Sequence, residues 1–224
     1  MIRRDPLWAL VPVRSLEDGK RRLSPFLAPE ERAALVRSML EDGLDALHRC
    51  AAVDTVAVVT GDAAAAEVAA EYGAVLLPEA PEAGLNRSLE GARAWLLSSY
   101  PRAHVLMLPA DLPGVTPAEL ETTVLAADAD VVLARSTDGG TNAMFLRPIA
   151  SLPFGFGLDS CQRHREAAVT AGRSVQVVDS PGLALDIDHP ADLAAYLKRG
   201  GSSRTLGLLH RLRIADRLKV AAAP

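Results

Sequence analysis

The sequence has few aromatic residues, few cysteines and no long apolar run. Aromatic side chains make up 4% of the 224 residues, so Ala, Val and Leu must build most of the core. This scarcity argues against nucleic-acid binding on aromatic stacking platforms. The formal net charge of −4 likewise argues against a basic field that attracts DNA or RNA. Two cysteines, Cys50 and Cys161, are too few for a disulfide framework or for a zinc site of their own.

The apolar segments are too short for membrane targeting. The apolar run near the N-terminus is broken by Pro12 and is shorter than the core of a signal peptide. No segment approaches the roughly 18 apolar residues that indicate a membrane span. We therefore expect a cytoplasmic protein with reduced thiols and no membrane span.

Short β-rich runs alternate with Ala- and Leu-rich helical patterns along most of the chain. The strands are expected at 8–13, 55–60, 74–79, 104–110, 130–136, 142–148 and 174–179. The helices are expected at 31–50, 62–73, 87–100, 117–127, 160–172 and 190–200. The alternation predicts an α/β fold with a mixed, mostly parallel central sheet and helices on both faces.

The C-terminal segment differs from the rest in charge. From Lys198 onward there are seven Lys or Arg residues and one Asp, a balance of 7 − 1 = +6, so the remainder carries −10. Residues 200–203 (Gly-Gly-Ser-Ser) are typical of a flexible joint. We therefore predict one domain over 1–199 and a basic tail over 200–224, either flexible or a loose or docked amphipathic helix.

Ligands of such folds bind beyond the carboxyl ends of the strands, so the loops after the strands deserve most weight. The loop after the first strand contains Arg14, Lys20, Arg21 and Arg22 but neither a Walker A motif nor GxGxxG. These cations can hold a triphosphate and neutralise its developing charge, although a solvated run of charges is an equally simple interpretation.

Three aspartates have the character of metal ligands. Asp111 follows an apolar strand between Pro109 and Pro113, which fix its direction. Alternation in an extended segment sends Asp186 and Asp188 to one face, where two carboxylates repel each other unless a cation lies between them. Mg2+ would meet that need, although Asp188 could instead cap the following helix, as we expect Thr116 to do for the helix at 117–127.

Three glycine-containing loops could bind anions through backbone N–H groups. They lie at 137–142, with Thr141 as an added hydroxyl donor, at 154–160, with Gly157 and Ser160, and at 84–86, with Gly84 and Asn86. Asp-Gly-Gly is also an ordinary hairpin turn. His164, one helical turn after Ser160, is more simply a structural residue than a site residue, and Cys161 has no evident partner base.

The same loops, in order, resemble a known family. PVRSLEDGKRRL, VVTGD, GLNRSLEGA, LPADLPG, DGGTNAM, FGFGLDS and LDIDHPADL are similar to motifs of the guanylyltransferases of coenzyme F420 biosynthesis. Those enzymes act on 2-phospho-L-lactate or phosphoenolpyruvate and have the nucleotide-diphosphosugar transferase (GT-A-like) fold. The resemblance spans roughly residues 8–198.

The resemblance implies roles for individual residues. Asp111, Asp186 and Asp188 match the aspartates that bind two Mg2+ ions, for which Mn2+ can substitute. Thr141, Gly157 and Ser160 match positions that hold the phosphate and carboxylate of the acceptor. The expected GTP contacts are Arg14, Lys20, Arg22, Gly84 and Asn86, and the expected catalytic residues are Lys20, Arg22 and Asp111.

The implied reaction is transfer of GMP from GTP to the phosphate of phosphoenolpyruvate, with release of pyrophosphate. The acceptor is already ionised, so the reaction needs alignment and charge neutralisation rather than a protein nucleophile. The same reaction on 2-phospho-L-lactate or 3-phosphoglycerate stays open. So do a nucleotidyltransferase that uses CTP or loads molybdopterin, and a non-catalytic nucleotide-binding domain. No nucleic-acid partner is expected, and a homodimer is compatible with the sequence.

Overall fold

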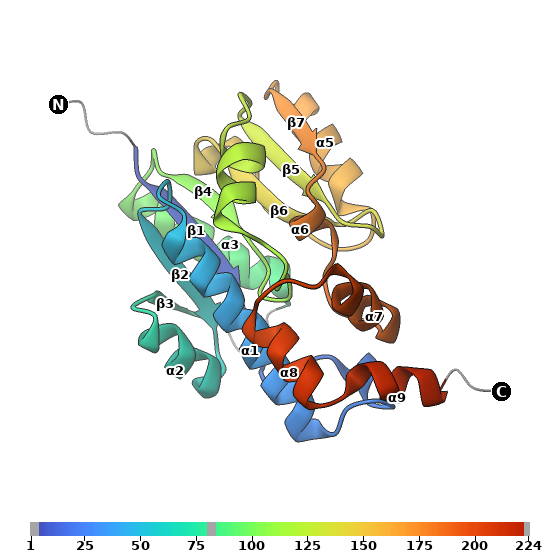
Figure 1. Ribbon diagram of the computed structural model, residues 1–224. Coiled ribbons are helices and arrows are strands. Elements are labelled where there is room, and N and C mark those ends of the chain that lie inside the picture. The colour runs from blue at the N-terminus through green and yellow to red at the C-terminus, as the bar shows by residue number, and fades with distance from the viewer. Residues whose placement is uncertain (1–4, 80–83, 222–224) are drawn as a thin grey trace.

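A seven-stranded sheet forms the centre of the computed structural model, which describes residues 5–79 and 84–221 (Figure 1). The strand order is β3-β2-β1-β4-β6-β5-β7. The strands are β1 (Leu7–Pro12), β2 (Thr55–Thr60), β3 (Val75–Pro78), β4 (His104–Met107), β5 (Val131–Arg135), β6 (Thr141–Leu146) and β7 (Val175–Val178). Neighbouring strands are parallel except that β6 is antiparallel to both β4 and β5. The predicted mixed, mostly parallel sheet is confirmed.

Helices cover both faces of this sheet. In Figure 1, α1 (Pro29–Arg49) and α2 (Ala63–Glu71) lie in front of it, and α3 (Leu85–Ser99) and α5 (Ser160–Thr170) lie behind it. Residues of β1 alternate between the two layers, since Ala9 and Val11 join the core under α1 while Trp8 and Leu10 join the core under α3. Burial on both faces explains why β1 is an almost continuous apolar run.

The starts of two helices follow from local capping. α1 begins at Pro29, two residues before the predicted start, and Glu31 accepts a hydrogen bond from the N–H of Ala28 at 2.9 Å. Thr116 caps α4 (Pro117–Glu119) as predicted, through a 3.2 Å hydrogen bond from the N–H of Glu119. The helix expected over 117–127 is a single α-turn followed by the π-helical segment η2 (Leu120–Leu125).

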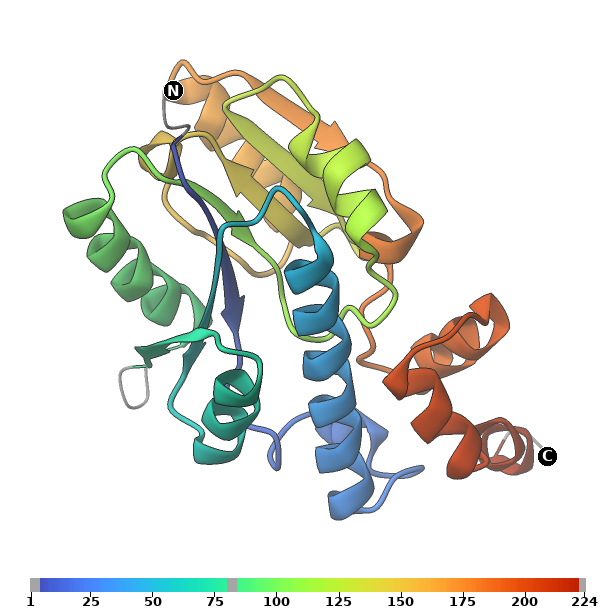
Figure 2. The same cartoon turned by 60° about the vertical axis from the view of Figure 1, so that its left-hand side comes forward.

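The C-terminal segment is docked on the domain. After α7 (Pro190–Arg199), α8 (Arg204–Arg211) packs against α1, and α9 (Ile214–Ala221) contacts α7 and α8 (Figure 2). Asp42 of α1 accepts hydrogen bonds from the N–H groups of Arg204 and Thr205 at 2.8 and 2.9 Å. The docked form of the tail is therefore the one that the structure shows. The boundary at 199/200 stays a prediction.

Three short helical turns complete the described chain: η1 (Arg21–Leu23), η3 (Ile149–Ser151) and α6 (Pro181–Ala184). No helix within residues 5–79 and 84–221 combines the length and apolarity needed to cross a membrane. The parallel strands β1, β2 and β4 end at one edge of the sheet. Because β6 runs in the opposite direction, its first residues, Thr141 and Asn142, lie at that same edge.

Candidate active site

A cavity of about 490 Å3 lies at this edge of the sheet. Eight of the residues predicted for the site line it: Arg14, Lys20, Asp111, Thr141, Gly157, Ser160, Asp186 and Asp188. They come from loops that lie far apart in the sequence; Lys20 and Asp188, for example, are 168 residues apart. A second hollow, of about 840 Å3, lies between α1 and the α7–α8 connection, and none of the predicted site residues is among the described residues that line it.

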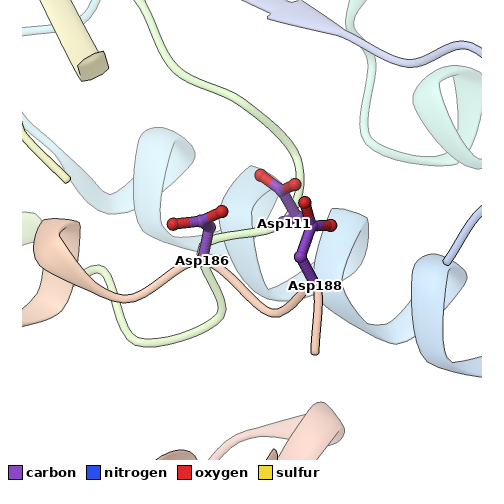
Figure 3. A group of neighbouring side chains, drawn as sticks. All are labelled: Asp111, Asp186 and Asp188. Atoms are coloured by element: carbon purple, nitrogen blue, oxygen red, sulfur yellow. The ribbon is translucent and has the colours of Figure 1, made fainter. Parts of the chain in front are cut away.

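The three predicted metal ligands lie side by side. Figure 3 shows Asp186 and Asp188 on one segment and Asp111 on the loop after β4, with the carboxylates pointing to the same side. One oxygen of each carboxylate lies within 4.8 Å of the others. The N–H of Ile187 donates to the backbone oxygen of Asp111 at 3.2 Å, and the Ile187 side chain is buried in the core. This single bond and the alternation of an extended segment bring the three carboxylates together.

Asp186 carries the clearest electrostatic conflict of the three. Burial raises its pKa, a hydrogen bond from Asn142 opposes this rise, and the negative charges of Asp111 and Asp188 raise the pKa further. Asn142 donates to Asp186 Oδ1 at 3.1 Å and to the backbone oxygen of Leu183 at 2.8 Å. Asn142 therefore fixes the direction of the Asp186 carboxylate.

Lys20 lies between the other two carboxylates. Its Nζ is 2.7 Å from Asp111 Oδ2 and 2.6 Å from Asp188 Oδ1, and its side chain is 9% exposed. Burial would lower the pKa of Lys20, but the charges of Asp111 and Asp188 more than offset it, so the pKa is raised. The backbone of Lys20 adopts the left-handed conformation, with φ of 53°, directly before η1.

The carboxylates fit a divalent cation. Three carboxylate oxygens in reach of one another, one of them with a raised pKa, form a set of hard oxygen donors with uncompensated negative charge. The ammonium group of Lys20 already satisfies two of them, which shows that a cation is stable at this position. Asp188 does not cap α7: the N-cap residue is His189, and the Asp188 carboxylate faces Lys20 and Arg22 instead.

The predicted acceptor residues, Thr141, Gly157 and Ser160, line a second part of the cavity, the acceptor wall. Thr141 and Ser160 are buried, and Ser160 donates a hydrogen bond to Thr141 Oγ1 at 3.1 Å. Gly157, with φ of 135°, lies beside them in a conformation that residues with a side chain rarely adopt. Among the hydrogen bonds of residues 5–79 and 84–221, none uses the backbone N–H of Gly157. The hydroxyl pair, with one hydrogen not used between its two members, and the amide of Gly157 can thus donate to an anion.

The loop at 154–157 is held in place by α3. Glu90 accepts the N–H of Phe154 at 2.7 Å, and Asn86 accepts the N–H of Phe156 at 2.7 Å and donates to its carbonyl oxygen at 2.9 Å. Asn86, predicted as a nucleotide contact, therefore has its whole amide group engaged with this loop. Gly84 is the exposed N-cap of α3, and neither residue lines the cavity.

The remaining cations and glycines are arranged unevenly. Arg14 is exposed on the cavity wall, whereas Arg22 is outside it, 66% exposed, with Nη1 3.6 Å from Asp188 Oδ2. In the turn after β5, the N–H of Gly139 donates to the carbonyl oxygen of Ser136 and that of Gly140 to Asp138. These two amides serve the hairpin, as the simpler interpretation of Asp-Gly-Gly held, and do not face an anion.

Two residues of the site were missed by sequence reasoning. Asn142 was part of the DGGTNA motif, but nothing in the sequence showed that it would orient Asp186. His164 was treated as a structural residue, yet its Nδ1 lies 3.1 Å from Thr141 Oγ1. Its spacing of four residues from Ser160 on one helix was the available signal.

Comparison with known proteins agrees with this geometry. A family model described as guanylyl transferase, CofC-like, matches residues 7–223. The chain is 37% identical to a phosphoenolpyruvate guanylyltransferase of Conexibacter woesei, over 92% of this chain and 96% of the relative. It is 36% identical to a 2-phospho-L-lactate guanylyltransferase of Methanothermobacter thermautotrophicus, over 96% and 98%. A 3-phospho-D-glycerate guanylyltransferase of Phenylobacterium zucineum is 37% identical, over 92% and 96%.

A solved structure confirms the fold. A protein from Desulfovibrio desulfuricans G20 assigned to the nucleotide-diphospho-sugar transferases superposes with a TM-score of 0.73. The alignment covers 96% of this chain and 97% of that chain, at 18% identity. The predicted nucleotide-diphosphosugar transferase fold is therefore correct.

Proposed function

The chain belongs to the CofC-like guanylyl transferase family, and on this premise we propose that it transfers GMP from GTP to the phosphate of phosphoenolpyruvate, releasing pyrophosphate, in coenzyme F420 biosynthesis. The observation that carries the proposal is the cavity itself. One wall holds three carboxylates that fit a divalent cation, and the other presents the hydroxyls of Thr141 and Ser160 and the N–H of Gly157. Such a pair of walls suits two phosphate-bearing substrates.

The reaction needs no protein nucleophile. A phosphate oxygen of the acceptor attacks the α-phosphorus of GTP, a new P–O bond forms, and the bond to the bridging oxygen breaks so that pyrophosphate leaves with the electron pair. The acceptor oxygen is already ionised at neutral pH, so no residue has to remove a proton. The residues of the cavity align the two substrates and neutralise charge.

Individual residues divide this work. Asp111, Asp186 and Asp188 would hold Mg2+, or Mn2+ in its place. Mg2+ bound there supplies neutralisation of the phosphate oxygens. Lys20 and Arg14, both on the cavity wall, face the triphosphate, and Arg22 acts from the rim beside Asp188. Thr141, Ser160 and the amide of Gly157 hold the phosphate and carboxylate of the acceptor.

Gly84 and Asn86 take an indirect part in this proposal. Asn86 fixes the backbone of Phe156, whose side chain lines the cavity, so its contribution to nucleotide binding runs through the loop. Guanine selectivity rests on the family membership. Relatives of nearly equal identity carry names with three different acids, so the acceptor is the part of the proposal that most needs a measurement.

The direct test is pyrophosphate release by the purified protein with GTP, Mg2+ and each of phosphoenolpyruvate, 2-phospho-L-lactate and 3-phosphoglycerate. We expect the highest kcat/KM with phosphoenolpyruvate. Phosphoenolpyruvate has a planar enol carbon where the other acids have a tetrahedral carbon. A pocket distinguishes such a difference in shape by about 1–3 kcal/mol of transition-state binding, so we expect some turnover of the other acids. We also expect GTP to be preferred over ATP and CTP.

Each outcome separates one part of the proposal. A clear preference for another acid overturns the choice of acceptor and leaves GMP transfer standing. Equal use of the three nucleotides overturns guanine selectivity. No pyrophosphate with any acid, from a folded protein supplied with Mg2+ and GTP, removes the proposed function.

A further inference from the structure

A buried histidine lies directly behind the acceptor wall. His164 of α5 is 3% exposed and contacts the wall through both ring nitrogens. Nε2 lies 3.0 Å from the backbone nitrogen of Gly155, and Nδ1 lies 3.1 Å from Thr141 Oγ1. The ring of Phe156, which lines the cavity, packs edge-to-face against the imidazole, with 5.0 Å between the ring centroids. One side chain thus links Thr141, the first residue of β6, to the loop at 154–157, the glycine loop.

These two contacts fix where the imidazole carries its proton. A backbone N–H can only donate, so Nε2 must accept from Gly155 and cannot carry a hydrogen. In the neutral ring the proton then lies on Nδ1, and Nδ1 donates to Thr141 Oγ1. Burial, with a smaller contribution from the charge of Arg163, lowers the pKa of His164 to about 4, so the ring is neutral at pH 7.

The fixed proton of His164 determines the polarity of the two hydroxyls beside it. Thr141 Oγ1 receives one hydrogen from His164, and one hydrogen lies between Thr141 and Ser160. The pair has two hydroxyl hydrogens in all, so one is left over, and because both residues line the cavity this hydrogen is free to be donated to a bound anion. This holds whichever of the two hydroxyls donates to the other. The wall therefore presents a donor and not a lone pair.

We propose that His164 is a positioning residue for the acceptor: it donates through Nδ1 to Thr141, turns the Thr141–Ser160 pair into a hydrogen-bond donor toward the acceptor anion, and holds Gly155 so that the loop carries Gly157 to the same anion. This rests on the proposed function, since the anion is the phosphate or carboxylate of the acceptor. His164 touches neither substrate nor metal ligands. Its effect runs through Thr141 and the loop.

Two substitutions separate the two contacts of the ring. In His164→Asn, the side-chain amide nitrogen can replace Nδ1 as the donor to Thr141. In His164→Gln, the longer side chain can place its oxygen at the position of Nε2 and accept from Gly155, but no donor reaches Thr141. Exposed His48 on α1, changed to Gln, is the matched control.

The measured quantities are kcat and the separate KM values for acceptor and GTP. For His164→Gln we expect the KM for phosphoenolpyruvate to rise on the order of tenfold, with the KM for GTP within about twofold. His164→Asn should recover most of that loss, and His48→Gln should match the wild type. Equal losses in the Asn and Gln variants, or an equal rise in the KM for GTP, would show that the ring only fills space and would overturn the proposal.

A second measurement does not depend on turnover. Nitrogen-15 NMR of histidine-labelled wild-type protein at pH 7 should show a neutral ring with the hydrogen on Nδ1 whose signal is absent from His164→Gln. His48, whose Nδ1 lies 3.0 Å from the carbonyl oxygen of Leu44, also carries a hydrogen on Nδ1, and its signal is identified by its loss in His48→Gln. A charged ring, or one with the hydrogen on Nε2, overturns the proposal by itself. If the wild type transfers GMP to none of the three acids, the proposed function fails and this proposal fails with it. Normal wild-type turnover with an unchanged acceptor KM in His164→Gln removes the role of His164 alone.

Discussion

At the scale of single residues, Asp186 combines charge, burial and repulsion in one side chain. Asp186→Asn removes one negative charge but keeps an oxygen that can accept from Asn142. We expect the rate of GMP transfer to fall on the order of a hundredfold or more, because the cation loses a charged ligand. Without metal, the melting temperature should stay equal or rise, because repulsion from Asp111 and Asp188 is relieved.

The measurements are kcat at saturating Mg2+ and thermal unfolding of both proteins. Asp128→Asn is the matched control, since the Asp128 side chain is fully exposed, with Oδ1 3.9 Å from Nη1 of Arg147. Near wild-type turnover of a folded Asp186→Asn protein would remove Asp186 from the proposed metal site.

Lys20 offers a second prediction, on metal affinity. In the structure its ammonium group occupies the space between Asp111 and Asp188, where a divalent cation would compete with it. Lys20→Met should therefore bind Mn2+ more tightly in the absence of nucleotide, by about tenfold, because one positive charge within 3 Å of both carboxylates is removed. Its turnover should fall at the same time, since the triphosphate loses a cation.

Titration with Mn2+, followed by electron paramagnetic resonance of the free ion, measures this affinity. Arg21→Met is the control, because Arg21 is 77% exposed and pairs only with Asp18 among the described residues. Unchanged or weaker Mn2+ binding by Lys20→Met would mean that Lys20 and the cation do not share a position.

The predicted site residues that the structure brings together and the residues that the sequence missed differ in kind. Asp111, Asp186, Asp188 and Lys20 follow strands, and the topology of a parallel sheet brings such residues together at one edge. Asn142 and His164 act through other side chains, and such contacts depend on distances between elements far apart in the sequence. The raised pKa of Asp186 could likewise not be predicted, because its largest cause is burial, which the sequence does not give.

At the scale of elements, apolar runs and capping residues predicted every strand of the described sheet. The antiparallel direction of β6 was open to prediction, because the five-residue connection over 136–140 is too short for a parallel crossover and indicates a hairpin. The short helix α6 was missed since four residues carry no periodicity. For the tail, the sequence allowed an amphipathic helix but left open whether it docks; α8 docks through its buried Leu206, Leu208 and Leu209.

Docking of α8 gives the prediction at this scale. Leu209 is fully buried in the core cluster that contains Leu40 and Leu44 of α1. Leu209→Ala should lower the free energy of unfolding by about 2–5 kcal/mol, the cost of a cavity in a packed core, and should leave kcat within about twofold. Urea denaturation measures the first and pyrophosphate release the second. The control is Val169→Ala on α5, where the side chain is 63% exposed; it should change neither the free energy of unfolding nor kcat. If Leu209→Ala left the free energy of unfolding unchanged, α8 would not be part of the cooperative fold.

At the scale of the whole molecule, the site is built where both faces of the sheet contribute. Asp111 and Asp186 are reached from the α1 side, whose core contains Ile187, whereas His164 and the glycine loop belong to the α3 and α5 side, whose core contains Phe154 and Cys161. The two parts of the cavity are therefore supported by different hydrophobic cores. Because packed cores transmit strain, a change in the packing of either core should change the distance between the two parts of the site.

Global stability should accordingly depend on the protonation of His164. Its pKa is about 4 in the folded chain and near 6.5 in the unfolded chain, so between these values the unfolded state binds a proton that the folded state does not. Stability is then lost as the pH falls below 6.5 toward 4. Lowering the pH from 7 to 4.5 should cost roughly 2 to 3 kcal/mol through this group.

Urea denaturation at pH 7 and pH 4.5, of the wild type and of His164→Asn, isolates that contribution. The raised pKa of Asp186 acts in the opposite sense, because protonation at low pH relieves its burial, but both proteins share this effect and it cancels in the comparison. The wild type should therefore lose about 2 to 3 kcal/mol more than the variant over this range. An equal loss in both proteins would mean that His164 titrates near its ordinary value, and a neutral imidazole at the acceptor wall would then not be enforced by burial.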